Sequence, residues 1–175
     1  RSCLVGSEMC IRDRLWPLLQ QRLLFEHFTH DASLIPVETY PLWQRQFRRL
    51  GARAANAAWY RSGMDQGEIE ALRDRIAAEG PLSTHAFDSA AESREMWARK
   101  PHKKALEQMW YAGVLATSTR RNFVKYYDLG ERVFPPLPPD APDEAAAGAA
   151  LCELAMQRLW VASPGEIRKF WEVLP

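Results

Sequence analysis

The chain of 175 residues is 47% hydrophobic, a content typical of folded globular proteins and not of disordered ones. Its 23 basic residues nearly cancel its 22 acidic ones, so the overall charge favours neither nucleic acid, a membrane surface nor an acidic substrate. The sequence contains no apolar run long enough for a membrane-spanning helix and no secretory signal. We therefore expect a cytoplasmic protein without a membrane partner.

The first 14 residues do not join any hydrophobic period that follows. Their string CLVGSEMCIRDR is similar to a translated adapter sequence, so we interpret residues 1–14 as a leader that is not native to the protein. This interpretation removes Cys3 and Cys10 from consideration and leaves Cys152. The three cysteines have no metal-ligand spacing, and their odd number argues against a disulfide framework.

Apolar spacing predicts a helix over residues 15–24, and residues 25–28 form a candidate strand. Pro36 then biases the residue before it toward extended backbone. Helical spacing returns over residues 37–59. The face of this helix opposite its apolar residues is basic, with Arg45, Arg48, Arg49 and Arg53.

A capping-box pair at residues 65 and 68 predicts the start of a helix that ends at Gly80-Pro81. A short second helix follows over residues 83–87, and a third runs from Pro101 to a C-cap glycine, Gly113. Strand-like segments at 114–117 and 123–127 enclose a predicted turn at residues 120–122. Three helices followed by a hairpin form a winged helix, so we predict a complete winged helix over residues 63–135.

Residues 136–142 are rich in proline and are predicted to be a stiff linker. An Ala-rich helix is predicted over residues 143–159, and Ser163, Pro164 and Glu166 have the pattern of a capped helix start. Because this order repeats the opening of the 63–135 unit, we interpret 143–175 as the start of a further, truncated winged helix. We interpret 15–62 as the end of a first helical or winged-helix module.

The predicted fold class is therefore mainly α with small β-hairpins, an α+β arrangement of tandem winged helix-turn-helix modules. In such a module the second helix of the helix-turn-helix presents its N-terminal residues to the major groove, and the wing reaches phosphate or the minor groove. Basic residues gather in both places. We predict a surface for double-stranded DNA made of Arg99, His102, Lys103, Lys104, Arg120, Arg121 and Lys125. The alternative is a solvated basic face of a protein-binding winged helix.

His27 and Asp31 have the i,i+4 spacing of two metal ligands on one helix face, with His30 close by. No third ligand is evident, so we favour structural roles, a hydrogen-bonded histidine and a capping aspartate. Glu26 and Asp31 could be read as paired carboxylates, but the same structural interpretation applies to them. We expect no metal and no small-molecule cofactor.

Four segments together carry a resemblance to a known family: LLFEHFTHDASLIPVETYPLW, IEALRDRIAAEGPLSTHAFD, KKALEQMWYAGVLATSTRRNFVKYYDLGERVFP and the terminal FWEVLP. They resemble the YcaQ family of winged-helix DNA glycosylases, which repair crosslinked and alkylated DNA. The resemblance implies a row of winged helices on DNA and metal-free hydrolysis of the N-glycosidic bond of an alkylated purine. It further implies a monomer associated with the nucleoid.

The family's catalytic motif, a glutamine followed two residues later by glutamine or aspartate, lies N-terminal to the segment that matches here. Gln20-Gln21 is not that motif. The resemblance therefore implies that this chain is a fragment that binds DNA but lacks the principal catalytic residues, with His30 and Asp31 as candidates for the border of the lesion site. The alternative from another class is a non-catalytic winged-helix transcription regulator.

Overall fold

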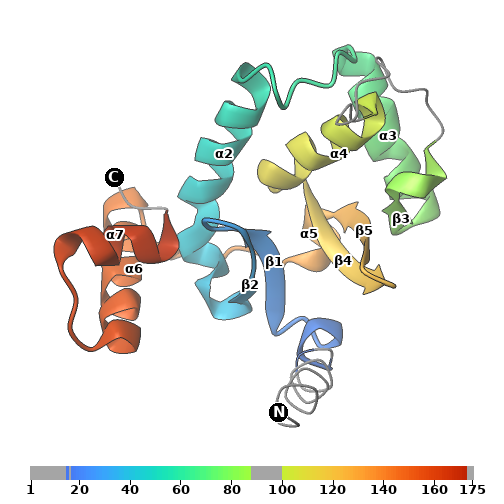
Figure 1. The fold of residues 1–175 in the computed structure, drawn as a ribbon. Helices are drawn as coiled ribbons and strands as arrows, with labels where there is room; N and C mark the ends of the chain where they lie inside the picture. The colour runs from blue at the N-terminus through green and yellow to red at the C-terminus, as the bar shows by residue number, and fades with distance from the viewer. Residues whose placement is uncertain (1–14, 16, 88–99, 173–175) are drawn as a thin grey trace, which may run out of the picture.

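The computed structural model describes residues 15, 17–87 and 100–172. It combines helices with two small antiparallel sheets (Figure 1), which confirms the predicted α+β class. None of the helices in these ranges is long and apolar enough to cross a membrane. Two predictions concern residues outside these ranges: Arg99 as a DNA contact and residues 1–14 as a leader that is not native to the protein.

The N-terminal part is a hairpin followed by helices. Strands β1 (Leu24–Phe28) and β2 (Ala32–Pro36) pair antiparallel, then come the 3₁₀ helix η1 (Val37–Trp43) and helix α2 (Gln44–Asn56). The predicted helix over 15–24 is wrong in its second half, because the chain is helical only to Gln20 and enters β1 at Leu24. The predicted helix over 37–59 is a 3₁₀ helix that contains Pro41, followed by a shorter α-helix.

The middle part begins with helix α3 (Gln66–Glu79), which has the predicted capping box between Asp65 and Glu68. Strand β3 (Leu82–Ser83), the 3₁₀ turn η2 (Thr84–Ala86) and helix α4 (Pro101–Tyr111) follow. Strands β4 (Leu115–Arg121) and β5 (Val124–Leu129) complete a three-stranded sheet in the order β3-β5-β4. Strand β3 was not predicted, because two residues show no period.

The turn between β4 and β5 lies one to two residues later than predicted. Arg120 and Arg121 belong to β4, where they pair with Lys125 and Val124. The two turn residues are Asn122 and Phe123, whose φ angles of 48° and 66° are both left-handed, as in the tight hairpin turns that suit twisted strands. Because side chains alternate along a strand, Arg120 and Arg121 face opposite sides of the sheet.

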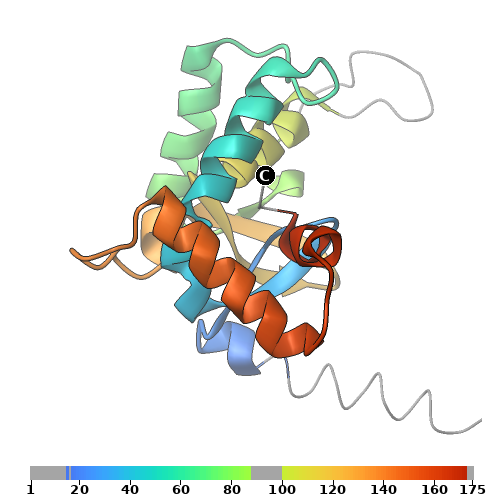
Figure 2. The ribbon, with the colours of Figure 1, turned by 90° about the vertical axis from the view of Figure 1, so that its left-hand side faces the viewer.

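The C-terminal part consists of α5 (Gly130–Val133), an extended proline-rich stretch, α6 (Glu144–Leu159) and α7 (Pro164–Trp171). The predicted capping box at the start of α7, between Ser163 and Glu166, is confirmed. Helices α6 and α7 pack against each other, and α6 also packs against η1 (Figure 2).

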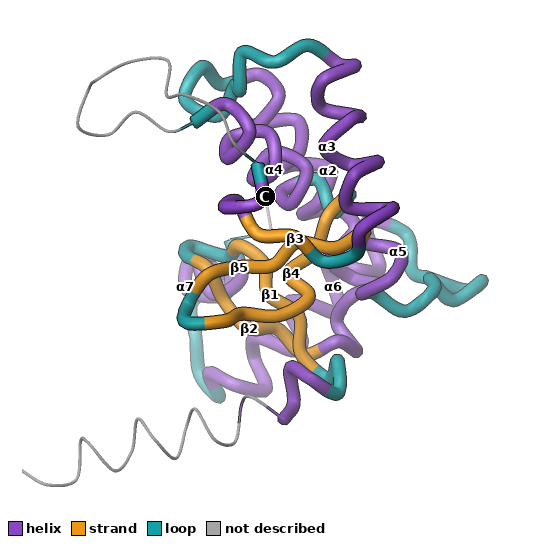
Figure 3. The backbone as a smooth tube through the Cα atoms, turned by 90° about the vertical axis from the view of Figure 1, so that its right-hand side faces the viewer, coloured by secondary structure: helices purple, strands orange, loops and turns teal. Residues whose placement is uncertain are grey.

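Two hydrophobic cores lie on either side of β1, which runs beside β4 (Figure 3). The first core joins Phe25, Trp43 and Phe47 to residues of α6 and α7, including Trp171. The second lies between α3, α4 and the three-stranded sheet. Segments 15–62 and 143–175 thus contribute to one core, although they were predicted to belong to separate modules. The module boundaries themselves stay a prediction.

Gly113 allows α4 to end directly against α2. Its φ of 75° is left-handed, and a Cβ at this position would lie 2.8 Å from ring atoms of Phe47. Glycine alone satisfies both conditions without strain. The predicted C-cap role of Gly113 is therefore joined by a packing role, since the missing side chain leaves room for the Phe47 ring.

We expect Gly113→Ala to lower the free energy of unfolding by about 2–4 kcal/mol, since it adds left-handed strain to a clash with a buried ring. Urea denaturation followed by circular dichroism measures this change. Gly165→Ala is the matched control: it lies in the first turn of α7 with no atom nearer than 3.9 Å, so its effect should stay within about 1 kcal/mol. Equal stability of both variants would contradict the packing role.

Candidate nucleic-acid interface

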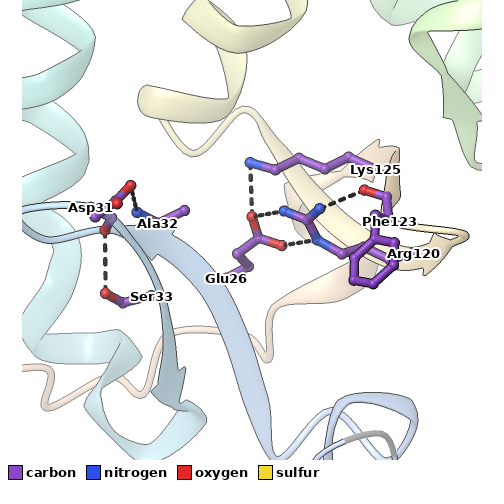
Figure 4. A network of polar contacts seen from close by, with 7 residues as sticks. All are labelled: Glu26, Asp31, Ala32, Ser33, Arg120, Phe123 and Lys125. Atoms are coloured by element: carbon purple, nitrogen blue, oxygen red, sulfur yellow. Dashed lines mark hydrogen bonds and ion pairs between the residues drawn. The ribbon is translucent and has the colours of Figure 1, made fainter. Parts of the chain in front are cut away.

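Glu26, in the middle of β1, is a carboxylate that is only 5% exposed. Arg120 of β4 binds it with two hydrogen bonds, from Nε at 2.8 Å and from Nη2 at 2.7 Å. The Nζ atom of Lys125 on β5 lies 2.8 Å from the same carboxylate. Figure 4 shows the three side chains converging from β1 and from the β4–β5 hairpin. One acidic residue thus ties the N-terminal hairpin to the second sheet.

The cluster has a net charge of +1, because two cations surround one anion. Burial raises the pKa of Glu26, but the hydrogen bond from Arg120 and the charge of Lys125 outweigh burial, so its pKa lies below the ordinary value. The hydrogen bond to Glu26 likewise raises the pKa of Arg120. Lys125 also lies 3.7 Å from the centre of the Trp110 ring, which adds a cation–π contact. Glu26 and Arg120 therefore both stay charged at neutral pH.

Of the cations predicted to bind DNA from the β4–β5 hairpin, Arg120 and Lys125 are engaged within the protein. Arg121, which faces the other side of the sheet, is exposed. Its guanidinium lies 4.9 Å from the centre of the Tyr126 ring, and it forms no ion pair with a described residue. Alternation along β4 thus divides two neighbouring arginines into an internal clamp and an outward-facing cation.

On α4, Lys103 is exposed and Lys104 is partly buried, and neither is ion-paired within the described part of the chain. His102, in contrast, is 4% exposed and lies near the Phe87 ring, with ring centroids 6.1 Å apart. It belongs to the inner face of α4 together with Leu106 and Met109, at the helical spacing of i, i+4 and i+7. The structure thus places His102 in the core, and its contact with DNA stays a prediction.

His27 is a buried part of the junction between the two cores. Its Nδ1 accepts a hydrogen bond of 2.9 Å from Nε1 of Trp43, so Nε2 carries the proton of the neutral ring. That proton is directed toward the carbonyls of Trp110 and Tyr111 without reaching hydrogen-bond geometry. Burial lowers the pKa of His27 to about 4, against the opposing effect of the two carbonyls.

The other residues considered as possible metal ligands, His30 and Asp31, lie at the turn between β1 and β2. His30 and Asp31 are exposed there, and Asp31 Oδ1 accepts a hydrogen bond from the backbone nitrogen of Ala32 at 2.7 Å. Asp31 therefore stabilises the turn locally. Among the described residues no three metal-binding side chains gather in one place, so His27 and Asp31 do not form part of such a cluster.

A groove of about 810 Å³ runs beside the β4–β5 hairpin. Residues 117–123 form one wall and residues 32–34 of β2 another, with Glu26 between them and Leu15, Pro17, Leu19 and Gln20 closing one side. The volume is in the range of ligand-binding clefts. The lining residues include Ser33, Thr117, Ser118 and Thr119, and Thr117 Oγ1 is a buried oxygen without a hydrogen-bond partner in the described structure. His30 and Asp31 do not line this groove.

Gln44 and Gln46 have the spacing of the family's catalytic motif, a glutamine followed two residues later by a second glutamine. This pair was not among the predicted site residues. Gln44 and Gln46 both lie on α2. Gln44 donates a hydrogen bond to the carbonyl of Tyr40. Gln46 is fully buried and donates to the carbonyl of Phe28 while accepting from Arg49. The side-chain amide of Gln46 is thus committed to the fold, and neither glutamine lines the groove.

A family model described as "DNA glycosylase AlkZ-like" matches residues 10–175. The match begins within the segment that was interpreted from the sequence as a leader. No solved structure was found that matches the chain.

We expect the buried, neutral His27 to make the protein less stable as the pH falls from 7 to 4.5. Because its folded pKa of about 4 lies below the unfolded value of 6.5, the unfolded chain takes up a proton first, and stability is lost from pH 6.5 downward. The loss assigned to this residue is roughly 2–3 kcal/mol. Denaturation at several pH values should show a smaller fall for His27→Gln, whereas His85→Gln, at an exposed position, should keep the fall of the original chain. Identical falls in all three would contradict this assignment.

Proposed function

The chain belongs to the AlkZ-like DNA glycosylase family, and on that premise we propose that it is the DNA-docking part of a repair enzyme for alkylated or crosslinked purines. The observation that carries this proposal is the family match over residues 10–175, which spans both cores and both sheets. The enzyme would hydrolyse the N-glycosidic bond between the damaged base and its sugar.

The order of elements between residues 65 and 135 supports a winged helix as the docking unit. The β4–β5 hairpin follows helix α3, strand β3, turn η2 and helix α4. Strand β3 pairs with the edge of β5 opposite to β4, so that β5 is the central strand. In this interpretation α4 is the recognition helix and the β4–β5 hairpin is the wing. The capped start of α7 after α6 is consistent with a further module of the same kind.

The charges favour a phosphate partner over a catalytic role for Glu26. A glycosylase stabilises the positive charge that develops on the sugar as the bond breaks. Two cations already compensate the carboxylate of Glu26, so the cluster repels a positive charge and attracts an anion. The amines and guanidinium of Lys103, Lys104 and Arg121 extend the same preference over α4 and the wing.

We expect replacement of Lys103, Lys104 and Arg121 together by alanine to weaken binding to duplex DNA by roughly five- to tenfold for each phosphate that is no longer neutralised, at 0.1 M salt. The slope of log K against log salt should become shallower by about 0.9 for each such phosphate. Fluorescence anisotropy at several salt concentrations measures both quantities.

A control that removes two cations elsewhere is Arg168→Ala with Lys169→Ala, because both residues are exposed on α7, on the opposite side of the molecule from the wing (Figure 1). It should leave affinity and slope nearly unchanged. If the triple variant binds DNA with the original slope, the basic face of α4 and the wing does not bind phosphate, and the protein-binding alternative gains support.

We further expect the 175-residue chain not to release 7-methylated purine from alkylated DNA above the rate of spontaneous depurination. The reason is that Gln46 is fully buried and both ends of its side-chain amide are hydrogen-bonded to Phe28 and Arg49, so the pair Gln44 and Gln46 cannot act together on a water molecule. Chromatography of released bases provides the measurement, with heat-treated substrate as the positive control. Release above background would place an active site within this chain and would contradict the division of labour that we propose.

A further inference from the structure

Phe123 stands at the tip of the β4–β5 turn with 79% of its surface exposed. Burial of a phenylalanine ring is favourable by about 1.5–3 kcal/mol, and this fold gains little of it here. The residue also has a left-handed φ of 66°, a conformation that disfavours side chains larger than those of glycine and asparagine. Phe123 thus combines a largely exposed ring with a backbone conformation that is unusual for a bulky residue.

The tip is held in a fixed place by the buried charge cluster. Nη1 of Arg120 donates a hydrogen bond of 2.6 Å to the carbonyl oxygen of Phe123, while the other nitrogens of the same guanidinium bind Glu26. A rigid connection thus runs from the interior of β1 to the turn (Figure 4). An aromatic ring on a braced turn gives up less conformational freedom on binding than one on a loose loop.

The surroundings of the ring match the chemistry of duplex DNA. Exposed Arg121 precedes the turn, and the cluster of net charge +1 lies behind it. Phosphates would be attracted to both, whereas the ring itself offers a flat apolar surface on which bases can stack. Proteins that bend DNA insert apolar side chains between base steps in this manner. Phe123 also lines the groove beside the wing, which leaves open space next to the ring.

We propose that Phe123 is a wedge that enters the duplex and unstacks neighbouring bases when the wing docks. This inference rests on the proposed DNA-docking function and adds a residue that positions the DNA. An alternative occupant of the tip, a second copy of the chain or another protein, would bury the ring without any change in base stacking.

The test uses the 175-residue chain and duplexes that carry 2-aminopurine, a base whose fluorescence rises when it is unstacked. With saturating protein we expect a severalfold rise for at least one placement of the probe. Phe123→Ala should abolish the rise and weaken binding by roughly tenfold, as expected when an aromatic ring no longer stacks on a base. The salt slope should be unchanged, because the same phosphates stay neutralised. Phe123→Trp should retain the rise.

Trp160→Ala provides the matched control, since Trp160 is also an exposed aromatic residue, at 85%, with a left-handed φ of 64°. It lies at the turn between α6 and α7, away from the wing (Figure 1), and should behave like the original chain. Binding of the original chain without a rise at any probe position, or an unchanged rise with Phe123→Ala, would overturn the wedge and leave DNA docking intact. Absence of DNA binding by the original chain would overturn both proposals.

Discussion

The buried carboxylate of Glu26 sets how the two halves of the protein meet. Removal of water from a carboxylate is costly unless cations and hydrogen bonds replace that water, and Arg120 and Lys125 supply both. Because Arg120 lies on β4 and Lys125 lies on β5, their ion pairs with Glu26 fix both strands of the hairpin against β1. Loss of one partner from a buried ion pair commonly destabilises a protein by about 3–5 kcal/mol, so the docking of the hairpin is specific as well as strong.

The same constraint explains the composition of β1. Phe25 packs in the first core, Phe28 packs against the second core, and Glu26 binds Arg120 of the second sheet. A strand buried on both sides needs apolar or internally satisfied residues at every position. His27 meets this need as a neutral ring between Trp43 and Trp110, and Glu26 meets it as a compensated charge. In the sequence, Glu26 and His27 look like candidates for catalysis or metal binding. In the structure, their polar groups are mainly compensated by neighbouring side chains within a buried strand.

The sequence allowed accurate prediction of what depends on neighbouring residues. The capping boxes at Asp65 and Ser163 and the glycine that ends α4 carry their information within a few positions, and all were predicted. The pairing of Glu26 with Arg120 spans 94 positions and has no local signal. The burial of His102 was missed because it depends on which face of α4 meets the second core, and the hairpin turn was misplaced because Asn122 and Phe123 adopt it in place of glycine.

The division of the basic residues limits what electrostatics can do for this surface. Of the predicted DNA-contacting residues that the structure describes, Lys103, Lys104 and Arg121 remain for external partners, since Arg120 and Lys125 are engaged by Glu26 and His102 is in the core. If each of these three residues neutralises one phosphate, as we propose, the affinity is modest and salt-sensitive compared with that of proteins that make six to ten such contacts. A surface of this kind needs contacts that salt does not screen if it is to stay on one damaged site, and the wedge that we propose at Phe123 would provide such a contact. On this proposal the ion pair of Arg120 with Glu26 also serves docking, because the same guanidinium that binds Glu26 holds the turn in place.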